Sequence, residues 1–497
     1  MQDYVGIDMG TSSVKLLVMD SGGRILRQHE ERYAVSCPQK GWREADPVLW
    51  YEKTMTGLRV LLKGIDKKSI RAIGITGQMH STVFLDKDGK LIRPAILWND
   101  TRTSKEVWML KEKIADIRQI AYISDIISTG SPAANLYWLR RHEAEQFQCM
   151  EHFLIGPDYL VFRLTGEYGT DFCEASTSSL FDLKQRIWSE DMRRILGLSP
   201  QIFPAVMGSA CAAGNLIPEI AEETGLSSDT LVVRGTGDNA AAAFAASPFW
   251  GGKPVISLGT SGVLLLEQEE PDILRKGKNI LFSEDGRRFK WLVQGAVQSS
   301  GSSVEWWAKK ILDAKSVESP DSAKERMHEN ELLFYPHLNG EKTLYGDAGL
   351  RGAFMGIGMD TTRADMSIAV LEGICFAFRE LYEKMGGRRF EGLQIGVVGG
   401  GAKNTFWMQM MADVLHAAIV RLKGTAGAVY GAAMLAAKGA GDTEPFRKEQ
   451  QVKGQEREIF YPRPDKSRYY DEKYKKYLRA YQALSYINAG ENGCRAV

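Results

Sequence analysis

Residues 6–15 of this 497-residue chain read GIDMGTSSVK, and this stretch decides which fold we expect. Apolar runs at Tyr4–Ile7 and Val14–Met19 flank it and predict two strands that a glycine turn joins into a β-hairpin. The backbone N–H groups and hydroxyls of such a turn suit the phosphates of a nucleotide. Asp8 enters the turn from a buried strand, where a carboxylate is costly unless a cation meets it. A Mg²⁺ ion bound through water is one such cation, and an ordinary turn in which Asp8 bonds its own backbone is the alternative.

A similar pattern returns about half of the chain later. The run Pro254–Leu258 predicts a strand, and the turn Gly259-Thr260-Ser261-Gly262 leads into another strand at Val263–Leu266. Two Gly-Thr hairpins predict two halves of related design that bind one nucleotide from both sides. A third glycine turn at 399–401 lies between an apolar run and a helix predicted from about Asn404. It would let an adenine or ribose lie against the backbone, or serve only as a packing turn.

The remaining strands and helices alternate along the chain, which is typical of the α/β class. The predicted strands are Ala72–Ile75, Thr82–Leu85, Leu231–Val233 and Leu393–Val398, and the predicted helices are Asp46–Leu62, Arg102–Arg118, Asp238–Ala246, a stretch from about Asn404 to Ala417, and Ser467–Tyr486.

The length exceeds what one hydrophobic core usually fills, so we expect two domains. Ser247-Pro248 and the glycines that follow should break the preceding alanine-rich helix. We therefore predict an N-terminal domain over residues 1–246, a C-terminal domain over 247–487 and a short tail over 488–497.

Asp238 follows the turn Gly235-Thr236-Gly237 and begins an alanine-rich helix. Capping of the helix N-terminus is the common role of an aspartate at such a position. The alternative is a general base that accepts a proton from a hydroxyl group attacking a phosphoryl group. Phosphoryl transfer asks mainly for alignment and charge neutralisation, so one well-placed carboxylate can suffice. The local sequence leaves both interpretations open.

The charge balance and the cysteines limit the kinds of partner and the cellular location that we expect. Sixty-three basic and 62 acidic residues leave a formal net charge of +1, which argues against a nucleic-acid or membrane-surface partner. The six cysteines are scattered and form no CxxC pair, as in reduced proteins. The first residues turn polar within eight positions, so we expect no signal peptide and a cytoplasmic location. The chain also lacks the GxxxxGK[ST] pattern of a P-loop.

Together these segments resemble the FGGY carbohydrate kinases over roughly residues 3–440. The resemblance is carried by Gly6–Lys15, Gly74–His80, Arg93–Arg102, Asp158-Tyr159-Leu160, Thr165-Gly166-Glu167, Gly237–Ala240, Ser257–Gly262, Gly399–Ala402, Trp407 and Met411-Ala412-Asp413. It implies two ribonuclease-H-like α/β domains of the actin, hexokinase and Hsp70 ATPase superfold, with a central cleft. It also implies ATP and Mg²⁺ as cofactors and a small-molecule sugar as substrate, and it leaves the oligomeric state open, with a homodimer among the alternatives.

The resemblance implies a role for each matching residue. Asp238 would be the catalytic base, and Asp8 the second catalytic residue, linked to Mg²⁺ through water. The sugar would be held by Gln78, Met79, His80, Trp98 and Asn239. The nucleotide would be held by Gly10, Thr11, Ser12, Lys15, Gly259, Thr260, Gly400, Gly401 and Asn404.

Within the family the similarity is greatest to kinases of the ketopentose D-xylulose, because Met79-His80 stands where glycerol kinases usually have an Arg-Glu pair. Gluconate, ribulose or another polyol is the alternative substrate, since Pro157, Leu136, Lys342 and Leu344 depart from the family pattern. Two other classes are a non-catalytic sensor of sugar and nucleotide, which intact Asp8 and Asp238 disfavour, and an Hsp70- or actin-like ATPase acting on protein. The latter has no use for the Gln-Met-His segment.

Overall fold

A computed structural model describes residues 2–250, 253–270, 275–314, 330–347, 349–387, 392–422, 427–443 and 458–488. The chain forms two compact units that interleave in sequence. The first unit comprises Met1–Phe249, Asn279–Leu292 and Thr425–Gly454, and the second comprises Trp250–Lys278, Val293–Gly424 and Gln455–Val497. The chain therefore first passes between units close to the expected boundary, but it returns to the first unit twice.

Helix α10 (Asp238–Trp250) differs from our expectation at its end. It continues through Pro248, where we expected the helix to break. A proline inside a helix removes one backbone donor, and here that loss does not end the element.

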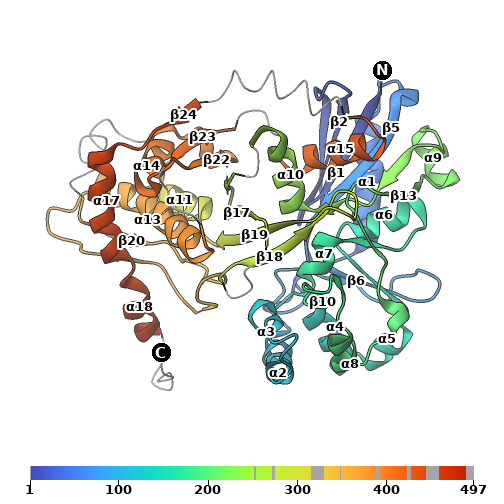
Figure 1. Cartoon of the computed structure of the whole chain (residues 1–497), viewed down its shortest axis with the longest axis horizontal. Helices are drawn as coiled ribbons and strands as arrows, with labels where there is room; N and C mark the ends of the chain where they lie inside the picture. Colours follow the sequence, from blue (N-terminus) through green and yellow to red (C-terminus); the bar gives the residue numbers. More distant parts are fainter. Residues whose placement is uncertain are drawn as a thin grey trace. The chain divides into compact units, whose positions relative to one another are not determined.

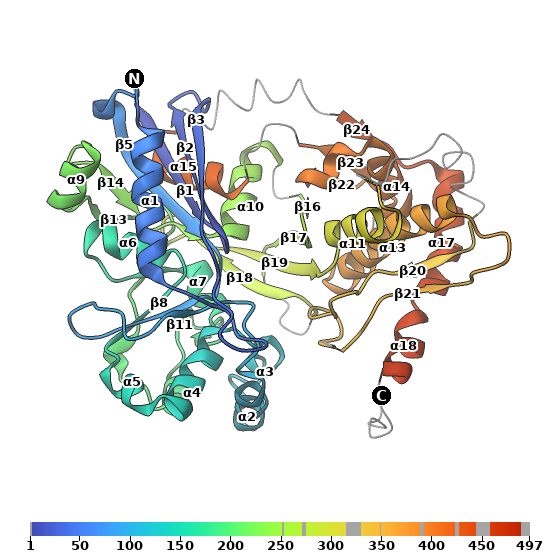
Figure 2. The ribbon, with the colours of Figure 1, turned by 180° about the vertical axis from the view of Figure 1, so that it is seen from behind.

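The first unit is built on a mixed sheet in the order β13-β14-β5-β1-β2-β3 (Figures 1 and 2), and β15 also pairs with β5. Strands β1 and β2 pair antiparallel, which confirms the predicted hairpin, and β1 pairs parallel with β5. The strands are β1 (Asp3–Met9), β2 (Ser13–Asp20), β3 (Ile25–Arg32), β5 (Ile70–Gly77), β13 (Ala212–Asn215), β14 (Leu231–Val233) and β15 (Thr236–Gly237).

Two helices from distant parts of the sequence cover the two faces of this sheet. Helix α1 (Pro47–Leu61) packs along β2 and β3 (Figure 2). Its Gly57 lies against Leu16. Helix α15 (Ala428–Gly439) covers the other face of β1 and β5 (Figure 1). A β-carbon on Gly6 would lie 2.1 Å from a backbone oxygen of α15, and one on Gly74 1.9 Å from another. Gly6 therefore serves helix packing rather than the phosphate turn.

A second, smaller sheet of the first unit runs in the order β4-β7-β6-β8. Its strands are β4 (Glu44–Ala45), β6 (Thr82–Leu85), β7 (Ala95–Ile96) and β8 (His152–Ile155). The other elements of this unit are α2 (Ser104–Ala115), α3 (Ile123–Ile126), α4 (Pro132–His142), α5 (Ala144–Cys149), α6 (Asp158–Thr165), β9 (Thr170–Asp171), α7 (Phe172–Thr177), β10 (Phe181–Asp182), β11 (Ile187–Trp188), α8 (Glu190–Leu196), β12 (Val206–Met207) and α9 (Pro218–Thr224).

The second unit repeats the arrangement of hairpin and parallel partner. Strand β16 pairs antiparallel with β17 and parallel with β22, as β1 does with β2 and β5. The sheet order is β18-β19-β17-β16-β22-β23-β24. Its strands are β16 (Val255–Leu258), β17 (Gly262–Gln268), β18 (Lys278–Phe282), β19 (Lys290–Val297), β22 (Gln394–Val398), β23 (Ala418–Arg421) and β24 (Glu458–Phe460), of which residues 279–292 belong to the first unit.

Helices pack on this sheet around one apolar core. The longest, α13 (Arg363–Lys384), begins with a capping box in which Thr362 and Asp365 satisfy each other's backbone donors. The others are α11 (Gly301–Trp306), α14 (Thr405–Leu415), α17 (Pro464–Tyr477) and α18 (Ala480–Asn488), and a small pair of strands joins them, β20 (Leu333–Tyr335) and β21 (Ala353–Met355). The single helix expected at the C-terminus is thus two. No helix in the described part of the chain combines the length and apolarity needed to cross a membrane.

Candidate active site

The turn between β1 and β2 is held by its own backbone and by one tyrosine. The N–H of Gly10 donates to the carbonyl oxygen of Ser13 at 2.9 Å, and the Tyr33 hydroxyl donates to the carbonyl oxygen of Gly10. The N–H of Tyr33 donates to the carbonyl oxygen of Ser12 at 3.0 Å. These bonds keep the turn in one shape, with Thr11 at its tip and the Ser12 side chain exposed.

Asp8 lies just before this turn, and one of its two carboxyl oxygens is buried. Its Oδ1 atom is buried and has no hydrogen-bond partner among the described residues. The pKa of Asp8 is raised to about 6, because the effect of burial exceeds the opposite effect of Lys15, which lies across the hairpin from Asp8.

The donor set around Asp8 fits a magnesium ion that arrives with a nucleotide. No group of three His, Cys, Asp or Glu side chains in the described ranges could hold a metal ion by itself. Mg²⁺ usually keeps several waters and binds through one or two carboxylates plus substrate phosphates. A single unpartnered aspartate oxygen beside a phosphate-type turn is the protein part of such a site.

Asp238 opens α10 directly after β15, which pairs with the end of β5. Its Oδ1 atom accepts a hydrogen bond from the N–H of Asn239 at 2.7 Å. A capping side chain accepts instead from a residue two or three positions further on, so this bond is not a cap. Burial first and the negative charge of Asp8 second raise the pKa of Asp238 to about 7. The two carboxyl groups predicted for catalysis are therefore electrostatically coupled.

The predicted sugar segment follows β5 and turns back toward β6. Gln78 is 2% exposed, and neither its amide oxygen nor its amide nitrogen has a hydrogen-bond partner among the described residues. The Nδ2 atom of Asn239 donates to the sulfur of Met79 at 3.7 Å, which joins this segment to the start of α10. His80 adopts a left-handed conformation with φ of 71°, which is strained for a residue other than glycine. Such strain is most common at functional sites.

Trp98 joins the sugar segment to the phosphate turn. Its indole N–H donates to the hydroxyl oxygen of Thr11 at 3.0 Å, and its backbone N–H donates to the hydroxyl oxygen of Ser81 at 3.3 Å. Trp98 is 40% exposed, so part of it is open to a ligand. Within the first unit, residues predicted for sugar, phosphate and proton transfer therefore come together.

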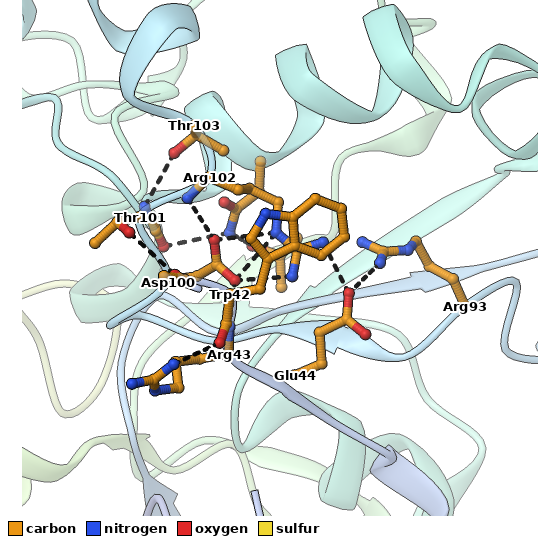
Figure 3. Close-up of polar contacts among 12 residues, drawn as sticks. Trp42, Arg43, Glu44, Arg93, Asp100, Thr101, Arg102 and Thr103 are labelled. Carbon is orange, nitrogen blue, oxygen red and sulfur yellow. Dashed lines mark hydrogen bonds and ion pairs between the residues drawn. The ribbon is translucent and has the colours of Figure 1, made fainter. Parts of the chain in front are cut away.

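A buried ion cluster fixes the turn that follows Trp98 (Figure 3). The guanidinium group of Arg102 donates to both oxygens of Asp100 and, at 2.7 Å, to Glu44. It also stacks 3.7 Å from the ring centre of Trp42. Asp100 in turn accepts from the backbone N–H of Arg43 at 2.6 Å. The cluster ties the segment after Trp98 to β4 through charge-assisted bonds.

The second unit holds the other predicted nucleotide residues in two glycine turns. The carbonyl oxygens of Gly259 and Thr260 accept from the backbone N–H groups that open α11. A side chain on Gly400 would meet nothing within 4 Å, so its backbone is open to a ligand, whereas one on Gly401 would meet Leu258 at 2.8 Å. Asn404 caps α14, because its side chain accepts from Trp407 at 3.0 Å.

Comparison with known proteins places the chain in a family. Residues 3–245 match the N-terminal domain model, and residues 255–440 the C-terminal domain model, of the FGGY family of carbohydrate kinases. The chain belongs to the FGGY carbohydrate kinases. The expected two-domain kinase fold and the assignment as a sugar kinase are thereby confirmed.

Several relatives of this FGGY kinase carry the same name. A xylulose kinase of Bacillus subtilis (strain 168) is 32% identical over 495 residues, which is 98% of each chain. A solved structure of a "xyloylose kinase" from Brucella ovis is 32% identical and has a TM-score of 0.87, covering 98% of this chain and 100% of the other. A gluconate kinase from Lactobacillus acidophilus has the same TM-score at 23% identity, covering 99% of each chain, so the fold alone does not select the sugar.

Sequence reasoning did not predict the acidic cluster behind the sugar segment of this kinase. Asp158, Asp171 and Glu174 are all buried, and Arg234 lies buried with them. Burial raises the pKa of Asp158 to about 8, even though the positive charge of Arg234 lowers it. Burial also raises the pKa of Asp171, and burial with three neighbouring acids raises that of Glu174 well above its usual value. Such a cluster has no sequence signature, because its members belong to different elements.

The four departures from the family pattern lie in structural positions. Leu136 is buried on α4, and Pro157 precedes the first residue of α6. Lys342 and Leu344 belong to a turn in the second unit, where Glu341 accepts from the N–H groups of residues 343, 344 and 345. Burial lowers the pKa of Lys342. Leu344 is buried in the core of that unit.

Proposed function

We propose that this FGGY kinase transfers the γ-phosphoryl group of ATP to D-xylulose and forms D-xylulose 5-phosphate and ADP. One observation carries the proposal: in a single unit, Asp238 lies beside the sugar segment through the bond between Asn239 and Met79. The hydrogen bond from Trp98 to Thr11 joins the same segment to the phosphate turn. The near full-length similarity to xylulose kinases supports the choice of sugar.

In the proposed reaction Asp238 is the general base. The oxygen of the sugar 5-hydroxyl attacks the γ-phosphorus, and its proton passes to a carboxylate oxygen of Asp238. The bond between the γ-phosphorus and the bridging oxygen breaks, and the electron pair leaves with ADP. A pKa near 7 suits this role, because a base works best when its pKa lies close to the working pH.

The sugar would be oriented by buried polar groups that have no hydrogen-bond partner among the described residues. Buried polar groups are almost always hydrogen-bonded, so an unpaired amide is available to a ligand. Gln78 is such a group, and it directly precedes Met79 and His80. Asn239, on the other side of the site, would bind a second hydroxyl. The exposed part of Trp98 would pack against the carbons of the sugar.

Each unit carries residues that the family resemblance assigns to the nucleotide. In the first unit Gly10, Thr11, Ser12 and Lys15 would contact the phosphates, and Asp8 would hold a Mg²⁺ ion through water. Mg²⁺ neutralises charge on the phosphates when it is bound. In the second unit Thr260 would add a backbone donor beside Gly259. The open backbone at Gly400 would contact the nucleoside with Gly401 next to it, and Asn404 would fix the helix that follows. We place the reaction in the cytoplasm, where ATP is available.

A substrate panel tests the proposal. ADP release is measured by a coupled assay with D-xylulose, ribulose, gluconate and glycerol, each across a range of concentrations. We expect the highest kcat/KM with D-xylulose, by at least about tenfold, a margin of about 1.4 kcal/mol in transition-state stabilisation. A higher kcat/KM for gluconate or ribulose would overturn the choice of sugar. An absence of ADP release with every sugar would indicate a sensor rather than an enzyme.

A further inference from the structure

Glu174 lies in α7, outside every segment that carries the family resemblance, yet it contacts the sugar site. A β-carbon placed on Gly237 would lie 3.0 Å from Oε1 of Glu174 and 2.6 Å from a side-chain carbon of Met79. Gly237 is the residue immediately before Asp238. Glu174 and Met79 therefore pack together against the backbone that carries the proposed base.

The same carboxyl group faces the strained turn at His80. The backbone N–H of His80 acts on Glu174 and lowers its pKa, although neither Glu174 oxygen has a partner with hydrogen-bond geometry among the described residues. The left-handed conformation of His80 is strained and persists only where its surroundings enforce it. A buried acceptor opposite this N–H is one such constraint.

The position of α7 is itself fixed. Asp171 caps the helix by accepting from the N–H of Glu174 at 2.9 Å, and its other oxygen accepts from the hydroxyl of Ser209 at 2.8 Å. From the opposite side, the hydroxyl of Ser176 accepts from the N–H of Leu281 at 3.0 Å. Glu174 thus projects from a helix anchored at both ends.

We propose that Glu174 is a positioning residue for the sugar site, where it sets the spacing between His80 on one segment and Asp238 on the other. The inference rests on the proposed function, because it assigns the residue to the sugar rather than to the nucleotide. Glu174 acts through these two neighbours and does not itself touch the reacting atoms.

Glu174 performs this role without a charge. The ionisable groups that face it are Asp158, Asp171 and Asp238, and each of them disfavours a second negative charge. Arg234, the buried cation of the cluster, acts on Asp158 and Asp171. Buried among these acids and without a hydrogen-bond partner among the described residues, the Glu174 carboxyl group stays protonated, because burial disfavours its charged form. The protonated group keeps one acceptor oxygen and one O–H donor.

Two substitutions test the role. Glu174→Gln keeps the shape, the acceptor oxygen and the neutral charge, so kcat and the KM for sugar should stay within about threefold of the wild-type values. Glu174→Met keeps the length but removes both polar atoms, so the KM for sugar should rise by about tenfold or more, which corresponds to about 1.4 kcal/mol. The KM for ATP should stay unchanged in both variants. If E174M does not fold, Glu174→Ala, which leaves room for water, replaces it.

Glu190→Met serves as the control, because Glu190 is an exposed glutamate of α8 that pairs with Arg193 and Arg194, and this variant should leave both KM values unchanged. Sugar binding is also measured by calorimetry without ATP. A chain that binds sugar but does not phosphorylate it contradicts the proposed function and still tests Glu174. An E174M variant whose sugar affinity and KM match the wild type would overturn the positioning role.

The pH profile tests the charge state. With Glu174 neutral, the acidic limb of kcat/KM should coincide in the wild type and in E174Q. If Glu174 were ionised, its replacement would remove a negative neighbour and lower the pKa of Asp238. The limb would then move to lower pH, which would overturn the uncharged form.

Discussion

At the scale of single residues, the pKa of Asp238 sets the pH range in which the proposed reaction can run. Burial and the charge of Asp8 raise this pKa to about 7, well above that of an exposed aspartate. A base must be ionised to accept a proton, so the active form is lost as the pH falls. We expect kcat/KM to decrease about tenfold per pH unit below about pH 7. A profile that is flat between about pH 5.5 and 7.5 would contradict this assignment.

Substitutions at the two aspartates separate their roles. Asp238→Asn cannot accept the proton, so turnover should fall by about 10²–10⁴-fold while ATP binding, measured by calorimetry, persists. Asp8→Asn removes the negative charge that raises the pKa of Asp238. The acidic limb of the remaining activity should therefore move to lower pH. An unchanged limb in Asp8→Asn would show that the two carboxyl groups are not coupled.

The sequence allowed these two aspartates to be predicted, but not Glu174. Asp8 and Asp238 stand beside glycine turns at the ends of strands, which is a local and readable pattern. Glu174 lies in a six-residue helix without a periodic apolar pattern. Its proposed role depends on neighbours from other elements, namely Asp158, Asp171, Asp238 and Gly237. The packing role of Gly6 could not be predicted for the same reason, because the oxygen that excludes its side chain belongs to residue 429.

At the scale of elements, the short strands β4 and β7 carry the turn that positions Trp98. They hold only two residues each, so their stability depends on the ion cluster that joins them (Figure 3). Two-residue strands have no periodicity and cannot be found from the sequence. Several elements of three residues or more were predictable. Strands β6 and β14 have the expected bounds, and the ends of β1, β5 and α1 lie within one or two residues of the predicted ends.

Arg102→Lys tests the importance of that cluster. Lysine keeps the charge but loses the planar fork that binds Asp100 and Glu44 together and stacks on Trp42. We expect the free energy of unfolding, measured in urea, to fall by about 1.5–3 kcal/mol. The KM for sugar should rise, because the turn after Trp98 loosens.

Arg43→Lys is the control for this substitution. The Arg43 side chain donates to a neighbouring carbonyl oxygen, and its bond to Asp100 comes from the backbone, which the substitution retains. Its effect on stability should stay within about 0.5 kcal/mol. Equal losses in the two variants would show that the geometry of the Arg102 fork does not matter.

At the scale of the whole molecule, the interleaving of the two units could not be predicted from the sequence. Residues 425–454 belong to the first unit, although the second unit separates them from most of it. The family resemblance predicted the class of fold. The sequence of α15, however, does not indicate which sheet this apolar helix covers. The domain limits at 246 and 247 were drawn as though each unit were continuous.

A fragment ending at Phe249 tests this arrangement. It retains every residue proposed to bind sugar but lacks α15, so the face of β1 and β5 that contains Gly6 and Gly74 is left uncovered. We expect a compact state that binds a hydrophobic dye, has little near-ultraviolet circular dichroism and unfolds without a sharp transition, whereas the full chain unfolds cooperatively. A sharp urea transition of the fragment would show that α15 is dispensable.

The position of α15 also sets an order of events during synthesis. Strand β5 ends at Gly77 and α15 begins at Ala428, so about 350 residues leave the ribosome between them. At roughly 5–20 residues per second this interval lasts about 20–70 s, far longer than a small domain needs to fold. The sheet of the first unit therefore emerges early, but the helix that covers one of its faces is synthesised late. In a growing polypeptide one apolar face of this sheet therefore stays uncovered for most of translation, a state in which exposed apolar surface favours aggregation.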